Sequence, residues 1–478
     1  MSSALDPAAT GVRSVSPVRR VAVLGSGYVG LTVAAGLASF GHRVTCTDVD
    51  VDRVDHLVAG DLGIVEAGLT ELIEDVRSLG RLQFLTDNIE AARSAEFVFL
   101  CLPTPGRSDG TLDTSSTEAV VTQIGRHLAP GARIVIKSTV PVGTARRVAE
   151  LLQRRDVAIV SNPEFLSEGT AVDNFLHPDR VVIGSDSVRA AMDVATLYGV
   201  GGVGECIVTD SQSAELIKFA SNAYLATRVT FINSVAELCE ATGANVRDVA
   251  RGIGSDHRIG TAFLSPGPGW GGSCFPKDSA ALVALADDVG VDATVVRSVI
   301  AANEWHSVRV ADKIADALDG DLSGKTIAIW GLAFKAGTDD VRHSPALKIV
   351  ERLRERGALF RAFDPGVSRP ITGITQCTTL EETCRGADAI LVTTEWEVFA
   401  RSDLDALGSL MTRRIMVDAR GAIDPGVALL AGFDYTGIGV GRDASDLEFT
   451  AMCLEQETRD PVVHATYPRH RDAADQSP

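Results

Sequence analysis

A glycine-rich turn between two apolar segments constrains the fold of this chain more than any other feature of its sequence. The first segment reads as a short buried strand that ends at Leu24, and residues 31–40 have the character of a helix. Strand, Gly-x-Gly-x-x-Gly turn and helix in this order are typical of a dinucleotide-binding unit, in which the pyrophosphate lies at the helix N-terminus. The turn residues that would contact the dinucleotide are Gly25, Gly27, Tyr28, Val29 and Gly30.

The residue after the next predicted strand, 43–47, points to the kind of dinucleotide. Asp48 stands eighteen residues after Gly30, where a carboxylate can accept hydrogen bonds from the ribose hydroxyls and would repel a 2′-phosphate. This favours NAD over NADP. The alternative is that Asp48 only starts a turn.

Two further buried strands, 96–102 and 133–137, lead to Thr104 and Thr139. Ligands of doubly wound sheets bind beyond the carboxyl ends of the strands, so both threonines are candidates for contact with cofactor or substrate. Hydroxyls are also common in ordinary turns, and that alternative stays open for both.

The alternation of strand and helix restarts near residue 325 without a complete Gly-x-Gly-x-x-Gly turn. We therefore expect a second nucleotide site for a group other than a dinucleotide. Lys335 and Arg420 stand at strand ends and are candidates for its phosphates, with ordinary surface positions as the alternative. The pattern predicts an α/β fold with two Rossmann-like doubly wound domains joined by a long central helix.

That helix is predicted over residues 213–241, where it would join the domains and pack against a second subunit. Lys218 and Asn222 are four residues apart and therefore project from one side of it. An ammonium and an amide side by side can orient a hydroxyl, help to remove its proton and later hold an oxyanion. The alternative for such a pair is a solvated surface position.

Cys274 lies in a loop rich in glycine and proline, just before a predicted helix. The helix start and Lys277 would favour the thiolate, which is the nucleophilic form. The alternative is a small buried hydrophobic residue without chemistry. Glu164 and Glu168 follow another predicted strand, and one of them could act as a base, unless they are a solvated acid pair.

The composition limits the class of partner. A net charge of −18 argues against nucleic acid and an anionic membrane as partners. The eight cysteines are scattered without paired spacing, which predicts reduced thiols in the cytoplasm and no zinc site. The length favours several domains, for which we expect these spans: a disordered leader at 1–18, an NAD-binding Rossmann domain at 19–210, a central helical domain with the cysteine loop at 211–320, a Rossmann-like domain for the sugar nucleotide at 321–454 and a flexible tail at 455–478.

Taken together, these motifs resemble the UDP-glucose 6-dehydrogenase family over roughly residues 19–450. The residues that carry the resemblance are 25–30, 138–144, 162–169, Lys218 with Asn222, 256–260, 269–278 and 338–342. The resemblance implies oxidation of the primary alcohol of a nucleotide sugar to a carboxylate, with two NAD per turnover. A homodimer or higher homo-oligomer is also expected.

The resemblance also implies roles for individual residues. Lys218, Asn222 and Asp278 would help to remove the hydroxyl proton, and Cys274 would form a thiohemiacetal and then a thioester. Glu164 would activate the water that hydrolyses the thioester, with Thr139 positioning water and Glu168 as the second choice of base. The other contacts expected for the cofactor are Thr104, Thr139, Glu168, Lys277 and Arg342. Those expected for the sugar nucleotide are Glu164, Phe165, Leu166, Lys218, Asn222, Arg258, Phe263, Gly267, Lys277, Phe334, Lys335 and Arg420, with Arg258 reaching across a subunit boundary.

Three alternatives stay open. The same chemistry could act on a UDP-N-acetylhexosamine or on GDP-mannose, because few loop residues decide the sugar. A β-hydroxyacid dehydrogenase would also use a Rossmann unit and a Lys/Asn pair, but it transfers one hydride and needs no thiol. A non-catalytic dinucleotide-binding regulator would keep the glycine turn and Asp48 but lose residues such as Cys274 and Lys218.

Overall fold

The computed structural model describes residues 17–199 and 204–441, which form two compact units. The first unit contains the described residues up to 228, together with 270–303 and 333–344. The second contains 229–269, 304–332 and 345–441. The tail predicted at 455–478 and all but two residues of the leader predicted at 1–18 lie outside the described residues.

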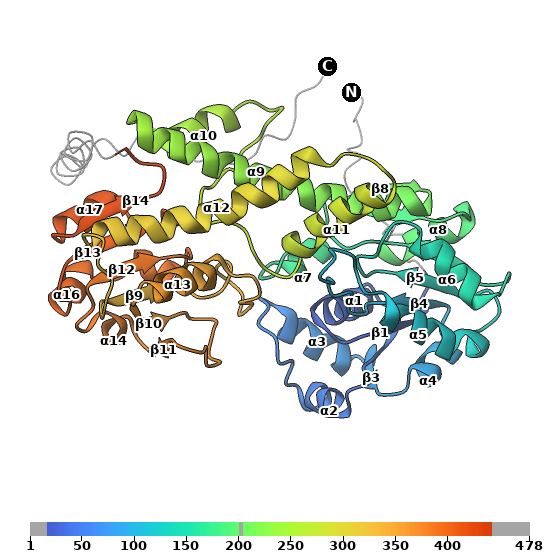
Figure 1. Ribbon diagram of the computed structural model, residues 1–478. Coiled ribbons are helices and arrows are strands. Elements are labelled where there is room, and N and C mark those ends of the chain that lie inside the picture. The colour runs from blue at the N-terminus through green and yellow to red at the C-terminus, as the bar shows by residue number, and fades with distance from the viewer. Residues whose placement is uncertain (1–16, 200–203, 442–478) are drawn as a thin grey trace, which may run out of the picture. The chain divides into compact units, whose positions relative to one another are not determined.

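An eight-stranded sheet forms the core of the first unit, in the order β3-β2-β1-β4-β5-β6-β7-β8 (Figure 1). All neighbouring strands are parallel except β6 and β7, which are antiparallel. The strands are β1 (Arg20–Leu24), β2 (Arg43–Thr47), β3 (Leu82–Leu85), β4 (Phe97–Leu100), β5 (Arg133–Ile136), β6 (Ala158–Ser161), β7 (Arg180–Gly184) and β8 (Glu205–Thr209). The helices between them are α1 (Tyr28–Ser39), α2 (Val51–Ala59), α3 (Leu69–Ser78), α4 (Asn88–Arg93), α5 (Ser115–Ile124), α6 (Thr144–Leu152), α7 (Ala171–Leu176) and α8 (Val188–Ala195).

Alternate residues of β1 pack into two separate hydrophobic clusters. Val21 and Val23 belong to one cluster, and Ala22 and Leu24 belong to the other. Both faces of the sheet are therefore covered, which explains why β1 is an unbroken apolar run without polar alternation. The order of the strands reverses between β1 and β4, so the ends of these two strands mark the place where such sheets bind ligands.

The second unit contains a six-stranded parallel sheet in the order β11-β10-β9-β12-β13-β14. Its strands are β9 (Thr326–Trp330), β10 (Leu359–Phe363), β11 (Thr375–Gln376), β12 (Ala389–Val392), β13 (Ile415–Asp418) and β14 (Asp434–Gly437). Its helices include α10 (Val246–Gly254), α13 (Pro345–Glu355), α14 (Leu380–Cys384), α15 (Glu397–Ala400), α16 (Leu404–Ser409) and α17 (Pro425–Leu430). The predicted fold class of two doubly wound domains is confirmed.

The predicted long helix is also confirmed, as α9 (Ser211–Thr242). Asp210 stabilises its start, since the carboxylate accepts hydrogen bonds from the backbone N–H and the hydroxyl of Ser213. The residues of α9 up to 228 belong to the first unit, and its remaining residues belong to the second. The other central helices are α11 (Phe275–Asp288), which lies in the first unit, and α12 (Thr294–Ala317), which like α9 continues from one unit into the other.

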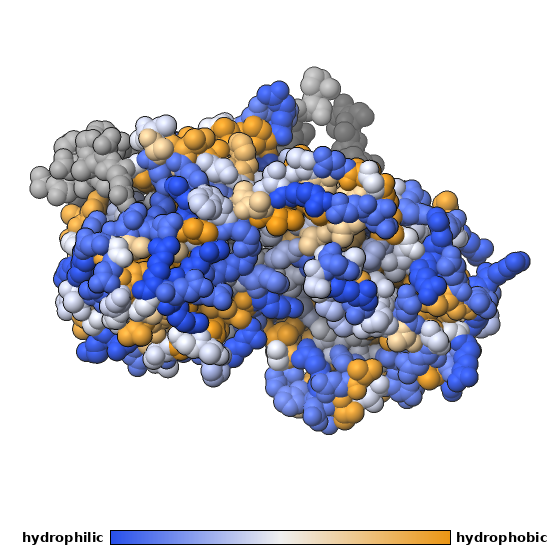
Figure 2. All heavy atoms as spheres, in the orientation of Figure 1, coloured by the Kyte–Doolittle hydropathy of each residue, from blue (hydrophilic) through white to orange (hydrophobic). Residues whose placement is uncertain are grey.

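Polar residues cover most of the face seen in Figure 2, with apolar residues scattered among them. In the part of the chain that the structure describes, no helix combines the length and apolar character needed to cross a bilayer.

Candidate active site

The turn after β1 is built for the close approach of a ligand. Gly25 has φ +99°, and a Cβ there would lie 2.4 Å from the carbonyl oxygen of Cys101. A Cβ on Gly30 would lie 1.9 Å from the carbonyl oxygen of Gly25, so both positions require glycine. Gly27 precedes the first helical residue, Tyr28, and a Cβ there would meet no atom within 4 Å. The N-terminus of α1 is thus open to an anion, and α1 begins three residues earlier than the sequence predicts.

Asp48 ends the second strand and faces the same turn. Its carboxylate accepts hydrogen bonds from the Ser26 backbone N–H at 3.0 Å and the Ser26 hydroxyl at 2.7 Å. Burial opposes the charge, but these hydrogen bonds hold the pKa of Asp48 below its usual value, so the group is a carboxylate at neutral pH. The open glycine turn with an ionised acid beside it fits an NAD-type dinucleotide, and the Asp48–Ser26 contact is a feature that the sequence motif does not reveal.

Two buried polar pairs meet at α9. The Lys218 Nζ donates to Glu164 Oε1 at 2.8 Å, and the Asn222 Nδ2 donates to Asp278 Oδ2 at 2.6 Å. The other oxygen of Asp278 accepts a hydrogen bond from Lys277 Nζ at 2.5 Å. Lys218 and Asn222 are only 3% and 6% exposed, which excludes the solvated surface pair that the sequence left open. Residues from three separate parts of the chain thus form one catalytic-type cluster.

Cys274 immediately precedes α11 and lies within electrostatic range of this cluster. Burial raises the pKa of its thiol, and the charge of Glu164 raises it further, while Lys218 and Lys277 act in the opposite direction. Lys277 thus lowers the pKa of the thiol, as the sequence predicts, but burial of the sulfur and the nearby carboxylates outweigh that effect, so the net pKa lies above the ordinary value.

Glu164 and Lys218 behave as a buried ion pair. Burial alone would favour the neutral acid, but the Lys218 charge and hydrogen bond lower the pKa of Glu164. Burial would also lower the pKa of Lys218, but the neighbouring acids, Glu164 first, raise it. Both groups are consequently charged at neutral pH, so Glu164 is a carboxylate that can act as a proton acceptor.

Glu168 has a different environment. Its carboxylate accepts hydrogen bonds from the hydroxyls of Ser273 at 3.2 Å and Thr338 at 2.9 Å, and it lies 3.8 Å from Arg342. Burial, assisted by the charge of Asp340, raises its pKa. Glu168 thus ties the Cys274 loop to residues 338–342, whereas Glu164 is the acid that contacts Lys218.

Other predicted residues of the first unit surround these groups. A Cβ on Gly272, which has φ +80°, would lie 3.0 Å from the ring of Phe334, so this glycine lets the ring pack on the loop. The Lys335 Nζ donates to the Ser167 hydroxyl at 2.9 Å, and the Arg342 carbonyl accepts the Gly272 N–H at 2.9 Å. Thr104 and Thr139 are both buried and follow the ends of β4 and β5 by four and three residues.

Four predicted residues lie in the second unit. Arg420 forms a bidentate pair with Glu395, with N–O distances of 2.6 and 3.0 Å. A Cβ on Gly267 would lie 2.3 Å from an Arg420 nitrogen, so these two residues are neighbours. The guanidinium of Arg258 is exposed and pairs with Asp256 at 2.6 Å, and Phe263 adopts φ +60°. The structure thus brings Arg420 and Gly267 together within this unit.

Three buried polar residues were missed by the sequence reasoning. Glu215 lies one turn before Lys218 on α9 and accepts hydrogen bonds from the backbone N–H groups of Gly143 at 2.6 Å and Ala145 at 2.9 Å. Glu66 accepts hydrogen bonds from the Tyr28 hydroxyl and from the Gly169 N–H at 2.6 Å. Lys137 ends β5, and burial lowers its pKa to about 8. The spacing of Glu215 from Lys218 was the one signal available in the sequence.

Histidine, cysteine and acidic side chains do not gather in threes or more as metal ligands anywhere within residues 17–199 and 204–441.

Comparison with known proteins identifies the family. Residues 19–200 match the NAD binding domain of the UDP-glucose/GDP-mannose dehydrogenase family, 212–305 match its central domain, and 328–425 match its UDP binding domain. The chain is 40% identical to a UDP-glucose 6-dehydrogenase from Pseudomonas aeruginosa over 88% of this chain and 97% of that protein. It is also 40% identical to a UDP-glucose 6-dehydrogenase from Rhizobium meliloti, over 88% of this chain and 99% of that protein.

Solved structures of related dehydrogenases also match this chain. A UDP-glucose dehydrogenase from Pyrobaculum islandicum matches with a TM-score of 0.79 and 33% identity, over 88% of this chain and 98% of that one. A UDP-D-ManNAc dehydrogenase from Pyrococcus horikoshii matches with a TM-score of 0.79 and 30% identity, over 88% of this chain and 99% of that one. Together with the site geometry, these matches lead to one conclusion: the chain belongs to the UDP-glucose/GDP-mannose dehydrogenase family and is an NAD-dependent dehydrogenase.

Proposed function

We propose that this enzyme oxidises UDP-glucose to UDP-glucuronate through a thioester on Cys274. The observation that carries the proposal is the buried cluster of Lys218, Glu164, Asn222 and Asp278 beside that thiol. A one-step β-hydroxyacid dehydrogenase would have no use for a thiol at this place. The identity to UDP-glucose 6-dehydrogenases from two bacteria supports UDP-glucose as the substrate.

NAD supplies the hydride acceptor in both oxidations. In the resting cluster Asp278 accepts from Asn222, and Lys218 stands one turn away on the same helix. In the first oxidation these three groups would hold the C6 hydroxyl and pass its proton to water as the aldehyde forms. The expected cofactor contacts are the glycine turn and Asp48, whose carboxylate would bind ribose hydroxyls.

The second oxidation would require a covalent adduct. The Cys274 sulfur adds to the aldehyde carbon, its proton passes to a neighbouring carboxylate, and the resulting thiohemiacetal becomes a thioester on loss of hydride. Of the carboxylates whose charge raises the pKa of the thiol, Glu164 has the largest effect and is the proposed acceptor, and it passes the proton on to water before hydrolysis. The Lys218 ammonium and the Asn222 amide would stabilise the oxyanion that forms.

Hydrolysis would complete the reaction. Glu164 would take a proton from water as the oxygen attacks the thioester, and Thr139, at the end of β5, would help to position that water. We favour Glu164 over Glu168 as the base because Glu164 contacts Lys218, while Glu168 is held by Ser273 and Thr338.

The residues proposed to contact the sugar nucleotide come from several parts of the chain. Phe165, Leu166, Phe334 and Lys335 would contact the sugar nucleotide from the first unit, and Arg420 and Gly267 from the second. Arg420 would then exchange Glu395 for a phosphate, since guanidinium binds both in bidentate fashion.

We further propose a homodimer that works in the cytoplasm. Tyr224, Phe231 and Leu238 recur every seven residues on α9 and are 61%, 53% and 64% exposed, which is unusual for one face of a long helix. A second copy of the chain would bury this stripe. A reducing compartment would keep Cys274 in its thiol form.

The yield of NADH at limiting UDP-glucose tests the function, with UDP-N-acetylglucosamine, UDP-galactose and GDP-mannose in parallel. About two NADH per UDP-glucose is expected from a four-electron oxidation. One NADH would show that the enzyme stops at the aldehyde, and two from another sugar nucleotide alone would keep the chemistry and replace the substrate. The parallel sugars matter because the relative from Pyrococcus horikoshii is named for a UDP-N-acetyl sugar.

A further inference from the structure

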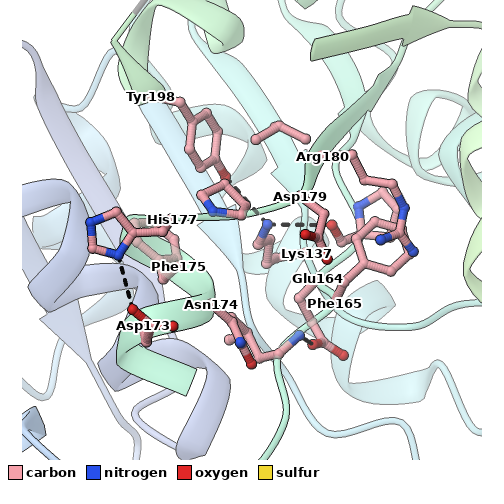
Figure 3. A pocket seen from close by; sticks show the side chains of 14 residues that line it. Lys137, Glu164, Phe165, Asp173, Asn174, Phe175, His177, Asp179, Arg180 and Tyr198 are labelled. Atoms are coloured by element: carbon pink, nitrogen blue, oxygen red, sulfur yellow. Dashed lines mark hydrogen bonds and ion pairs between the residues drawn. The ribbon is translucent and has the colours of Figure 1, made fainter. Parts of the chain in front are cut away.

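A polar cavity of about 200 Å³ lies beside Glu164 in the first unit (Figure 3). Its exposed residues form a mouth at the surface: Asp173, His177 and Asp179. Its buried polar residues form a floor: Lys137, Glu164 and Tyr198. The cavity therefore leads from solvent to the acid that contacts Lys218.

Pro163 also lines a second, much smaller cavity. Its volume is about 10 Å³, roughly the space that one water needs. Thr139, Glu215 and Lys218 line it. A water-sized space thus lies beside Lys218 and Thr139, and it shares Pro163 with the larger cavity.

The cationic groups of the larger cavity are already engaged. The Lys137 Nζ donates to Asn162 Oδ1 at 3.2 Å, to the Pro163 carbonyl at 3.4 Å and to the Tyr198 hydroxyl at 3.2 Å, which uses all three of its protons. The Arg180 guanidinium lies 3.9 Å from the centre of the Phe165 ring, and His177 pairs with Asp173 at 2.9 Å. Three acids, Glu164, Asp173 and Asp179, line the same cavity and disfavour an anionic ligand, whereas water needs only the polar surface.

The proposed reaction consumes one water for each uronate formed and releases protons. That water must reach the thioester after the second oxidation, when cofactor and sugar nucleotide lie over the cluster. Lys218, Asn222 and Asp278 are at most 6% exposed even without ligands. A route that does not pass through the ligand sites would solve this problem.

We propose that the larger cavity supplies the water that hydrolyses the Cys274 thioester, an inference that rests on the proposed function. The water oxygen bonds to the thioester carbon as one of its protons passes to Glu164. The carbon–sulfur bond then breaks with its electron pair on sulfur, and Cys274 and the product carboxylate separate. Each oxygen of Glu164 already accepts one hydrogen bond, from Lys218 or from the Leu166 N–H, and has a second lone pair for water.

Filling the cavity should slow hydrolysis and nothing else. Val181, on β7, lines the cavity, is 7% exposed and has no role in the proposed chemistry. Val181→Phe adds a ring to the cavity, Val181→Ala enlarges it, and Val188→Phe places the same ring at a position that is 70% exposed. Val181→Leu serves as a smaller plug if the phenylalanine variant does not fold.

Rapid mixing with NAD and UDP-glucose, followed by acid quench and intact-mass analysis, separates the steps. For Val181→Phe we expect an unchanged burst of two NADH, an acyl-enzyme that accumulates and a steady-state rate about tenfold lower; a tenfold change corresponds to about 1.4 kcal/mol. Val181→Ala and Val188→Phe should match the wild type. Turnover at the wild-type rate in a folded Val181→Phe or Val181→Leu variant would overturn the inference. So would a variant in which NADH formation slows as much as hydrolysis does. Wild-type enzyme that forms no acyl-enzyme or only one NADH would instead refute the proposed function.

Discussion

Single side chains in this enzyme are tuned by burial more than by position along the chain. Cys274 precedes a helix, but burial of the sulfur, together with nearby carboxylates, raises the pKa of its thiol. Among the neighbouring charges, that of Lys218 has the largest effect on the pKa of Glu164, and that of Glu164 has the largest effect on the pKa of Lys218. The charges at this site thus depend on contacts between residues far apart in the chain.

Replacing the thiol should stop formation of the carboxylate. Cys274→Ala leaves no nucleophile for the aldehyde, so we expect uronate formation to fall at least about 1,000-fold, as for other covalent nucleophiles. Product analysis by mass spectrometry checks this. Cys206→Ala is the matched control, because Cys206 is exposed on β8 and should be dispensable. Uronate formation at the wild-type rate in the Cys274 variant would exclude the thioester.

The thiol should also be unreactive at neutral pH in the resting enzyme. Because its pKa is raised, less thiolate is present at any pH below that pKa, and alkylation stays slow until the pH exceeds the ordinary thiol range. The rate of inactivation by iodoacetamide between pH 6 and 10 measures this. A plateau already reached near pH 7 would contradict the assignment.

Removing the cation of the buried pair should destabilise the fold. Lys218→Met leaves the Glu164 carboxylate buried without its partner, which costs about 3–5 kcal/mol. Glu164 has a lowered pKa in the wild type, so its contribution to stability is present above its unfolded pKa and is lost as pH falls through the folded one. The gap between wild type and variant in urea unfolding should therefore narrow at acid pH. The double variant Lys218→Met/Glu164→Gln should recover part of the loss, and no recovery would argue against the ion pair.

At the scale of elements, the turn between β1 and α1 combines two kinds of glycine. Gly25 and Gly30 are required by the backbone itself, because a Cβ would overlap neighbouring carbonyl atoms. Gly27 is different: its φ of −69° is open to any residue, and the space around it is empty. Glycine in this motif is therefore required by the backbone at Gly25 and Gly30, while at Gly27 it leaves the space around it open.

Alanine at these positions should separate stability from cofactor binding. Gly30→Ala should cost about 1–3 kcal/mol or more through overpacking. Gly27→Ala should cost less than about 1 kcal/mol, as expected at an N-cap, yet weaken NAD binding because the methyl group occupies the path of the pyrophosphate. Thermal unfolding and NAD titration of both variants check this. Equal effects of the two variants on stability would contradict the distinction.

At the scale of the whole molecule, α9 serves two purposes. Its inner side carries Glu215, Lys218 and Asn222, and its exposed side carries the apolar stripe of Tyr224, Phe231 and Leu238. One helix thus contributes to the proposed catalytic cluster and to the proposed contact with a second chain. Association of two chains would hold the helix from outside and so support the position of the cluster.

A charge in the stripe should dissociate the dimer. Phe231→Glu would place a carboxylate in the buried contact, and we expect the dimer to weaken at least about 30-fold, equivalent to about 2 kcal/mol at an interface hot spot. Light scattering over a concentration series measures the mass. Val188→Glu, at an exposed position on α8, is the control and should leave the mass unchanged. A wild-type protein that is already monomeric would refute the proposed homodimer.

The sequence by itself determined the helices and strands and the reactive side chains that are present. Apolar runs, glycines and helical spacing were sufficient for β1, for α9 and for the fold class, since these depend on residues near one another in the chain. Only the tertiary structure decided which side chains hydrogen-bond to one another. Glu164 accepts from Lys218, Asp278 accepts from Asn222 and Lys277, and Glu168 accepts from Ser273 and Thr338. It also decided the protonation of Cys274, because the pKa of a thiol depends on burial and on charges brought close by folding, which no spacing along the chain records.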